Sequence, residues 1–298
     1  MAQIVECIPN FSEGRNQDTI AALVKTAKSV PGVTLLDHSS DTSHNRSVIT
    51  MVGDPDGIAE AAFILCKLAG ETIDLTKHTG EHPRVGATDV IPFVPIREVS
   101  VADCVELSKK VAQRIWSELG IPCFLYEDSA SCPERQNLAK VRKGQFEGMP
   151  EKLLEEEWAP DYGERKIHPT AGVTIIGARP PLVAYNVNLN TSDVAIAQAI
   201  ADKVRGVKGG YKYCKAMGVL LEDRNVAQVS MNLVNYEGTP IYRVQEAIRF
   251  EAKRWGVEII GSELIGLAPA KALVDCAEYY LQIENFDYSR QVLESHLL

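Results

Sequence analysis

The sequence predicts a mixed α/β protein with two halves, each of which runs β-α-β-β-α-β. Long segments with apolar residues three and four positions apart are typical of amphipathic helices, and the short apolar runs between them are typical of strands. This element order is that of the split βαβ, or ferredoxin-like, arrangement. We therefore expect two ferredoxin-like subdomains, residues 1–180 and 181–298, each with helices on one sheet face and with a ligand cleft or tunnel between them.

The first half contains most of the clear element boundaries. Expected strands are 3–9, 33–41, 46–54 and 121–128, and expected helices are 18–30, 56–73 and 101–120. Asp18 is expected as an N-cap, and Gly120 closes the last of these helices. Residues 89–96 are apolar but contain two prolines. Because proline cannot donate to a β-ladder, they predict an edge or irregular strand.

The second half follows a less regular connection over 131–171. In that connection the acidic run 151–158 predicts a short solvated helix. Residues 173–190 predict a hairpin turned at Arg179, Pro180 and Pro181. Further strands are expected within 215–237, joined through 222–225, and over 257–269, and helices are expected over 193–206, 241–256 and 271–282. Asp193 lies near the cap of the first of these helices.

Composition excludes several classes of protein. A formal net charge of -9 argues against a general nucleic-acid binder. The N-terminal residues lack the regions of a signal peptide, and no run approaches the ~18 apolar residues of a membrane span. The seven cysteines are scattered without a CxxC pair. We therefore expect reduced thiols in a cytoplasmic protein, with no zinc site and no disulfide framework.

One loop, HTGEHPRVGATD at 78–89, concentrates titratable groups. His82 precedes a proline in this loop and is the first candidate for a catalytic acid or base, with a structural histidine as the equally weighted alternative. His78 lies four residues earlier, but Gly80 and Pro83 disfavour the helix that a metal-binding pair at this spacing needs. Arg84 suits recognition of a substrate carboxylate, and a salt bridge that pins the loop is as good an interpretation.

Three other polar segments follow or precede predicted strands. Asn10 belongs to one of them, NFSEG at 10–14, and Asp37 and Arg46 to another, DHSSDTSHNR at 37–46. Each is interpreted either as a turn or as part of a site at the strand ends. The third, YGERKIHPTAG at 162–172, is either a solvated linker or an anion clamp.

Several of these segments together resemble the glutamate formiminotransferase family. They are VECIPNFSEG (5–14), HTGEHPRVGATDVIPFVP (78–95), EWAPDYG (157–163), GARPPLVAYNVNLN (177–190) and LEDRNVAQVSMNL (221–233). They occur in order over nearly the whole chain. The resemblance implies two ferredoxin-like subdomains, a cytoplasmic homodimer and transfer of the formimino group from N-formimino-L-glutamate to N5 of tetrahydrofolate in histidine degradation.

The resemblance also implies roles for individual residues. The family's catalytic histidine corresponds to His82. Asn10, Asp37, Arg46 and Arg84 are candidates for substrate binding. This chain differs from some relatives at Ser39, so Asp37 or Asp41 is expected to replace an acid there. The implied folate-binding residues are Gly163, Glu164, Arg165, Lys166, Ile167, His168, Pro169, Thr170, Ala171 and Gly172.

The implied chemistry requires a proton to leave the folate nitrogen and another to reach the glutamate nitrogen. We hypothesise that His82 moves this proton through a tetrahedral intermediate, without a metal and without a covalent enzyme adduct. A separate cyclodeaminase is expected to process the product. Two alternatives stay open: transfer of a formyl group from 5-formyltetrahydrofolate to glutamate, and a non-catalytic folate-binding module.

Overall fold

The computed structural model describes residues 2–296, which form two compact units that divide between Arg179 and Pro180. Each unit has its own sheet. In the described part of the chain, no helix has both the length and the apolar character needed to cross a membrane.

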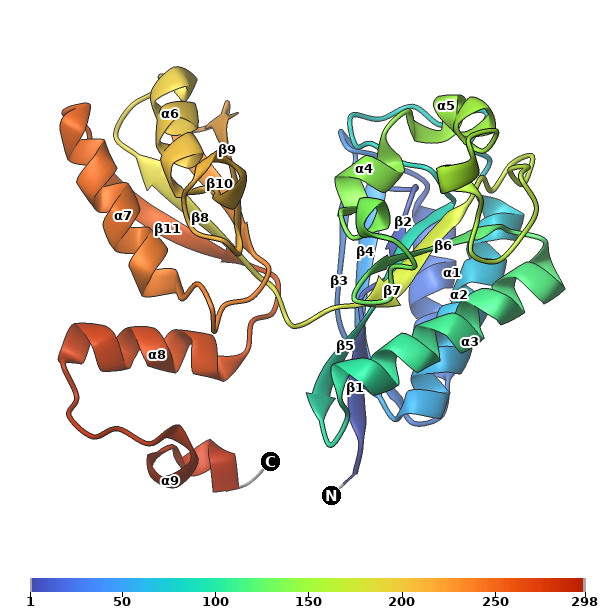
Figure 1. The fold of residues 1–298 in the computed structure, drawn as a ribbon, viewed down its shortest axis with the longest axis horizontal. Coiled ribbons are helices and arrows are strands. Elements are labelled where there is room, and N and C mark those ends of the chain that lie inside the picture. The colour runs from blue at the N-terminus through green and yellow to red at the C-terminus, as the bar shows by residue number, and fades with distance from the viewer. Residues whose placement is uncertain (1, 297–298) are drawn as a thin grey trace. The chain divides into compact units, whose positions relative to one another are not determined.

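The first unit contains a seven-stranded sheet with five α-helices (Figure 1). Its strands are β1 (Ile4–Cys7), β2 (Asn10–Phe11), β3 (Val33–Asp41), β4 (Arg46–Gly53), β5 (Thr88–Arg97), β6 (Cys123–Glu127) and β7 (Thr174–Ala178). Its helices are α1 (Gln17–Ser29), α2 (Pro55–Thr72), α3 (Val101–Leu119), α4 (Leu138–Arg142) and α5 (Gln145–Lys152).

The strand order of this sheet can be compared with that of the split βαβ arrangement. Strands β1 and β2 both lie between β4 and β5, and β3 pairs with the far side of β4, all antiparallel. Strand β7 then extends the sheet parallel to β5, and β6 extends it parallel to β7. The first four positions therefore follow the split βαβ order, with two parallel strands added at one side.

Capping side chains define the helix starts of the first unit. Asn16, rather than the expected Asp18, caps α1 by accepting from two backbone N–H groups. Asp54 caps α2, and Ser100 forms a capping box with Asp103 at the start of α3. As predicted, α3 ends at Gly120, which has a positive φ of 66°.

Both faces of this sheet carry a hydrophobic core. The larger core lies between the sheet and helices α1, α2 and α3. The expectation of helices on one sheet face alone was wrong for this unit, because the connection between the halves adds two short helices to the other face. On the other face, Val141 of α4 and Met149 of α5 pack over β5, β6 and β7. The exposed end of β3, from Asp37 to Asp41, lies away from this second core.

The prediction that residues 89–96 form an edge or irregular strand was wrong about the edge, whereas the register shifts in the pairing of β5 with β1 and β2 agree with an irregular strand. Strand β5 is a central strand, with β1 and β2 on one side and β7 on the other. The carbonyl of Pro92 still accepts a hydrogen bond from the N–H of Ile8 at 3.2 Å. A proline fits at this position because the sheet uses only its carbonyl oxygen as an acceptor and needs no N–H donor from it. The chain opposite Pro92 is also outside the regular strands, since β1 ends at Cys7 and β2 begins at Asn10.

Two further predictions about the connection between the halves were wrong. The strands within 173–190 do not form a hairpin, because β7 pairs in the first sheet whereas β8 (Val183–Leu189) pairs in a second sheet. Residues 151–158 are not one helix: α5 ends at Lys152, and a 3₁₀ turn follows over Glu156–Trp158. Burial of Leu153 and Trp158 explains the break, because both side chains enter the core under α4 and α5.

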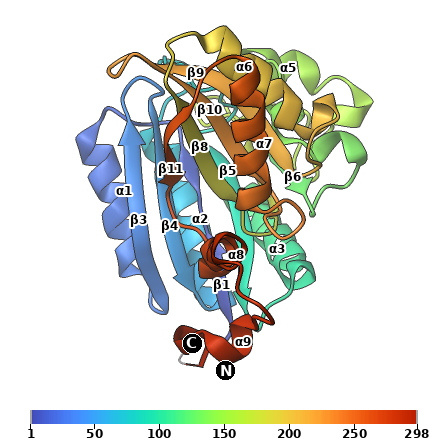
Figure 2. The ribbon, with the colours of Figure 1, turned by 90° about the vertical axis from the view of Figure 1, so that its left-hand side faces the viewer.

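The second unit has a four-stranded antiparallel sheet with the order β11-β8-β10-β9. Its remaining elements are α6 (Val194–Val204), β9 (Cys214–Leu221), β10 (Val226–Leu233), α7 (Ile241–Arg254), β11 (Ile259–Ile265), α8 (Ala270–Leu281) and α9 (Tyr288–Gln291). Helices α6 and α7 cover one face of the sheet (Figure 2). The strand order is again that of the split βαβ, and the predicted cap at Asp193 is confirmed.

The cysteines also match the expectation of reduced thiols. All seven are free, and five of them are buried. Burial raises the pKa of the Cys66 thiol to about 11. Such thiols are poor nucleophiles, so they contribute to packing rather than to chemistry.

Candidate active site

The loop that carries His82 connects α2 to β5 and is fixed at both sides. Ser12 donates from its hydroxyl to the carbonyl of Gly86 at 2.7 Å and from its N–H to the carbonyl of Ala87 at 2.9 Å. The N–H of Phe146 donates to the carbonyl of Arg84 at 2.9 Å. The loop is therefore held by the segment after β2 and by the start of α5.

The end of the 163–172 segment packs directly against this loop. Gly86 and Gly172 form a β-bridge, and the N–H of Ala87 donates to the carbonyl of Ala171 at 2.9 Å. Gly172 has a φ of 70°, and a Cβ there would collide with the carbonyl of Val85. Glycine is needed at this position because the two backbones meet closely.

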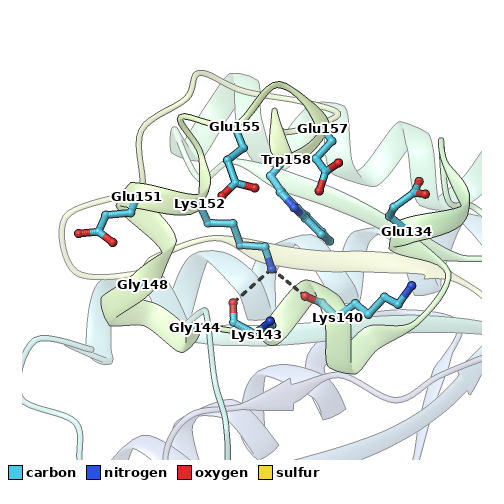
Figure 3. A pocket seen from close by; sticks show the side chains of 10 residues that line it. All are labelled: Glu134, Lys140, Lys143, Gly144, Gly148, Glu151, Lys152, Glu155, Glu157 and Trp158. Carbon is cyan, nitrogen blue, oxygen red and sulfur yellow. Dashed lines mark hydrogen bonds between the residues drawn. The ribbon is translucent and has the colours of Figure 1, made fainter.

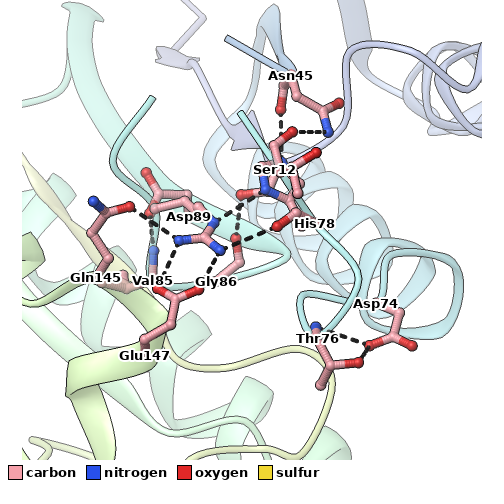
Figure 4. Close-up of polar contacts among 12 residues, drawn as sticks. Ser12, Asn45, Asp74, Thr76, His78, Val85, Gly86, Asp89, Gln145 and Glu147 are labelled. Carbon is pink, nitrogen blue, oxygen red and sulfur yellow. Dashed lines mark hydrogen bonds and ion pairs between the residues drawn. The ribbon is translucent and has the colours of Figure 1, made fainter. Parts of the chain in front are cut away.

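Arg84 pins the loop, which is the second of its two predicted roles. Its guanidinium makes a bidentate ion pair with Glu147, at 2.9 and 2.6 Å, and also donates to Gln145 at 3.0 Å. Nε donates to Nδ1 of His78 at 3.1 Å, so His78, Gln145 and Glu147 surround one guanidinium (Figure 4). Only 7% of Arg84 is exposed. The side chain is thus committed to protein partners.

His78 links this cluster to the turn between β3 and β4. Its Nδ1 accepts from Arg84, so its Nε2 carries the proton and donates to the carbonyl of Asn45 at 3.0 Å. Asn45 in turn accepts from the N–H of Gly14 at 2.8 Å and donates to the carbonyl of Thr79 at 3.0 Å. Both nitrogens of His78 are used, and burial lowers its pKa. His78 is a neutral connector between three loops.

His82 is half-buried beside the start of β4. Nη1 of Arg46 lies 3.4 Å from Nδ1 of His82, and because a guanidinium can only donate, Nδ1 is the acceptor. The proton of the neutral ring is then on Nε2, which is buried and has no partner. The His44 ring centroid lies 6.3 Å away. Burial and then the charges of Arg46 and Arg142 lower the pKa of His82 to about 3.

Two arginines lie near one carboxylate beside this imidazole, and only Arg142 forms an ion pair with it. Arg142, on α4, forms a close ion pair with Asp89, whose other oxygen accepts from the N–H of Val85 at 2.8 Å. In the part of the chain that the structure describes, the Arg46 side chain has no carboxylate partner. Burial and the charge of Arg142 lower the pKa of Arg46 to about 10. The surroundings of His82 are therefore positively charged.

Several buried polar atoms without a partner belong to His82, to the two arginines beside it and to a residue of the neighbouring strand β2. They include Nε2 of His82, the Nε atoms of Arg46 and Arg142, and Oδ1 of Asn10. Asn10 is opposite Val48 in the sheet, and Val48 and Arg46 lie two residues apart on one face of β4. The other such atoms in the described residues are Thr88 Oγ1, Arg135 Nε and Arg205 Nε. A buried polar group without a partner is costly, so the group around His82 is a candidate ligand site.

Some residues predicted to bind the substrate or the folate lie at a distance from His82. Asp37 is exposed and opposite Thr50, whereas Arg46 is opposite Asp41, so the two side chains lie about 13 Å apart along the strands. In the 163–172 segment, Glu164, Arg165 and Lys166 are exposed, and the printed backbone contacts with the His82 loop come from its last two residues, Ala171 and Gly172.

Sequence reasoning missed Arg142 and the two partners of Arg84 on α5. They come from the irregular connection, where no spacing indicated that α4 and α5 would lie over β5. Asn45 was part of a segment with an open interpretation. The structure confirms that the segment is a hairpin turn, in which Asn45 holds the His82 loop, and a role of the segment in a ligand site stays a prediction.

A separate depression of about 600 Å³ is lined by α4, α5 and the following turn (Figure 3). Lys152 donates within it to the carbonyls of Lys140 and Val141, both at 2.7 Å, and to that of Lys143 at 3.2 Å. Its ammonium also lies 3.8 Å from the centre of the Trp158 ring. Lys152 therefore closes the end of α4 and has no proton left for a ligand.

Comparisons with known proteins agree with the geometry. The family model of the formiminotransferase domain, N-terminal subdomain, matches residues 4–179, and the model of the formiminotransferase domain matches residues 184–294. The chain is 72% identical to a glutamate formimidoyltransferase of Streptococcus pyogenes serotype M1 over the full length of both proteins. It is 48% identical to a glutamate formimidoyltransferase of Thermoplasma acidophilum, over 95% of this chain and 94% of that protein. The formimidoyltransferase-cyclodeaminase of Mus musculus is 44% identical over 96% of this chain, which spans 54% of that protein.

Proposed function

The chain belongs to the formiminotransferase family, and on that basis we propose that it transfers the formimino group of N-formimino-L-glutamate to N5 of tetrahydrofolate. The full-length relatives carry glutamate formimidoyltransferase names, which supports this activity. Tetrahydrofolate is a co-substrate in this proposal, and no metal takes part.

His82 is the proposed catalytic residue. In the reaction a bond forms between N5 of the folate and the amidine carbon, and the bond from that carbon to the glutamate nitrogen breaks. One proton must leave N5 and one must reach the departing nitrogen. His82 moves this proton, because it is the half-buried imidazole whose Nε2 has no protein partner. This free nitrogen in a rigidly held loop is the observation that carries the proposal.

The neighbouring segments bind the reactants in this proposal. Residues 163–172 contact the folate, and their end at 168–172 adjoins the His82 loop. Asn10 and Arg46 bind the glutamate part, since each has a buried polar atom without a partner, the two lie on one face of the sheet, and Arg46 contacts His82. Arg84 keeps the loop in place and Asp37 lies farther away, so neither is placed in contact with the reacting atoms.

Four further properties of the protein stay predictions. These are a role in histidine degradation, a cytoplasmic location, a homodimer and a separate cyclodeaminase that consumes the product. None of them affects the test of the chemical step.

The activity is tested with purified protein and two donor pairs. We expect formation of 5-formiminotetrahydrofolate from formiminoglutamate and tetrahydrofolate, followed by absorbance between pH 5 and 9. The second pair, 5-formyltetrahydrofolate and glutamate, tests the formyl alternative. Turnover only with the second pair would replace the proposed donor, and binding of folate without turnover of either pair would show a binding module.

A further inference from the structure

The surroundings of His82 have an unbalanced positive charge. Arg46 and Arg142 contribute two positive charges, and Asp89 contributes one negative charge, so one positive charge remains. The Nε atoms of both arginines are buried without a partner. A guanidinium in this position is costly unless a ligand anion completes its pairing. The empty donors and the charge together indicate a site for one carboxylate.

We propose that Arg46 and Arg142 together bind one carboxylate of the glutamate substrate, and that this carboxylate releases Nδ1 of His82 for proton transfer. The inference rests on the proposed function for the identity of the substrate. It adds Arg142 to the substrate-binding residues, and it couples binding of the substrate to the ability of Nδ1 of His82 to accept a proton.

The coupling follows from the hydrogen bond between Arg46 and His82. While Nη1 of Arg46 donates to Nδ1, the ring keeps its proton on Nε2 and cannot accept another proton at Nδ1. A bound carboxylate competes with Nδ1 of His82 for the guanidinium of Arg46 and neutralises the excess positive charge. Nδ1 then becomes free to accept a proton, and Nε2–H can donate to the leaving nitrogen.

The positively charged and titratable basic groups around His82 act in one direction, against the single carboxylate of Asp89. Arg46 at the start of β4, Arg142 on α4, His44 in the β3–β4 turn and His78 in the same loop each lower the pKa of His82, after burial. A bound carboxylate opposes these charges and raises the pKa. By linkage, the same carboxylate must bind more tightly as the pH falls through the pKa of the occupied state.

The test is a titration of His82 in the full chain by ¹⁵N NMR of the histidine rings, with the signal assigned through His82→Gln. Glutarate is the probe, and glutaramide is its uncharged match. We expect glutarate to raise the pKa of His82 by one unit or more and to change the ¹⁵N shift of Nδ1 away from that of a nitrogen that accepts a hydrogen bond. Glutaramide is expected to change neither the pKa nor this shift. A glutarate complex in which the pKa and tautomer of His82 do not change would overturn the inference.

Variants separate this coupling from a general effect of charge. Arg46→Gln is expected to raise the pKa of His82 in the free protein and to abolish the further rise with glutarate. Arg46→Lys keeps the charge but lacks the planar fork, so it is expected to keep the low pKa and to bind glutarate about tenfold more weakly. Arg114→Gln, which removes an exposed ion pair of α3, is the matched control and is expected to behave as wild type. An unchanged response to glutarate in both Arg46 variants would place the carboxylate elsewhere.

This experiment measures no turnover, so its result is independent of the proposed function. A glutarate response without any one-carbon transfer would support the carboxylate site and reject the proposed reaction. Turnover of formiminoglutamate without the glutarate response would do the reverse.

Discussion

At the scale of single residues, two arginines of one site have opposite roles because their partners differ. Arg84 is buried and has a bidentate carboxylate, an amide and an imidazole as partners. Arg46 has the imidazole of His82 and no carboxylate among the described residues. The first arginine fixes a loop, and the second is available to a ligand. The sequence alone could not assign these roles, because Glu147, the partner of Arg84, comes from a distant position in the chain.

The contribution of Arg84 predicts a pH-dependent loss of stability. We expect Arg84→Gln to lower the free energy of unfolding at pH 7 by about 2–3 kcal/mol, since it removes several charge-assisted hydrogen bonds in a buried place. Arg84 holds the pKa of Glu147 below its usual value. A lowered carboxyl pKa stabilises the fold above the unfolded value, about 4.3, and this stability is lost as the pH falls through the folded pKa. The difference between wild type and variant should therefore shrink at pH 3.

Denaturant unfolding at both pH values provides the measurement. Arg114→Gln again serves as the control, because its exposed ion pairs are worth less than about 1 kcal/mol. An Arg84→Gln effect no larger than that of the control, or one that does not change with pH, would contradict the assigned role.

At the scale of elements, the short helix α4 depends on a lysine from the next helix. The ammonium of Lys152 donates to three carbonyls at the end of α4, and α4 carries Arg142 into the site. We expect Lys152→Met to keep the contact with Trp158 but to destabilise α4 by about 2 kcal/mol, because hydrogen bonds from a charged group are lost. Hydrogen exchange of the amides of residues 138–143 should become faster, with α1 unchanged. Equal protection of α4 in both proteins would contradict this account.

Most helices could be predicted from the sequence, whereas the pairing of the strands could not. Helices α1, α2, α3 and α7 were predicted because their apolar spacing and caps are local signals. The position of β5 in its sheet and the separation of β7 from β8 were not, because strand partners come from distant segments. The prolines in β5 predicted an edge or irregular strand and those at 180–181 predicted a hairpin turn, but β5 is central in its sheet and the second pair lies in a connection between two sheets.

At the scale of the whole molecule, the candidate site is an assembly of loops from distant parts of the sequence. Residues 10–14, the β3–β4 turn and residues 78–89 meet through Asn45, and residues 168–172 join them. The sequence identified these segments by their polar composition and family resemblance. It could not identify Arg142, which has no local signal and reaches the site only because α4 packs over β5.

The activity of a His82→Gln variant tests the central claim most directly. With formiminoglutamate and tetrahydrofolate at saturation, we expect kcat to fall by about 100-fold or more, because a positioned acid–base group contributes about that much. The dissociation constant for folate should stay close to that of wild type, and the Arg114→Gln control should keep its full activity. A variant that turns over at nearly the wild-type rate would show that His82 does not move the proton.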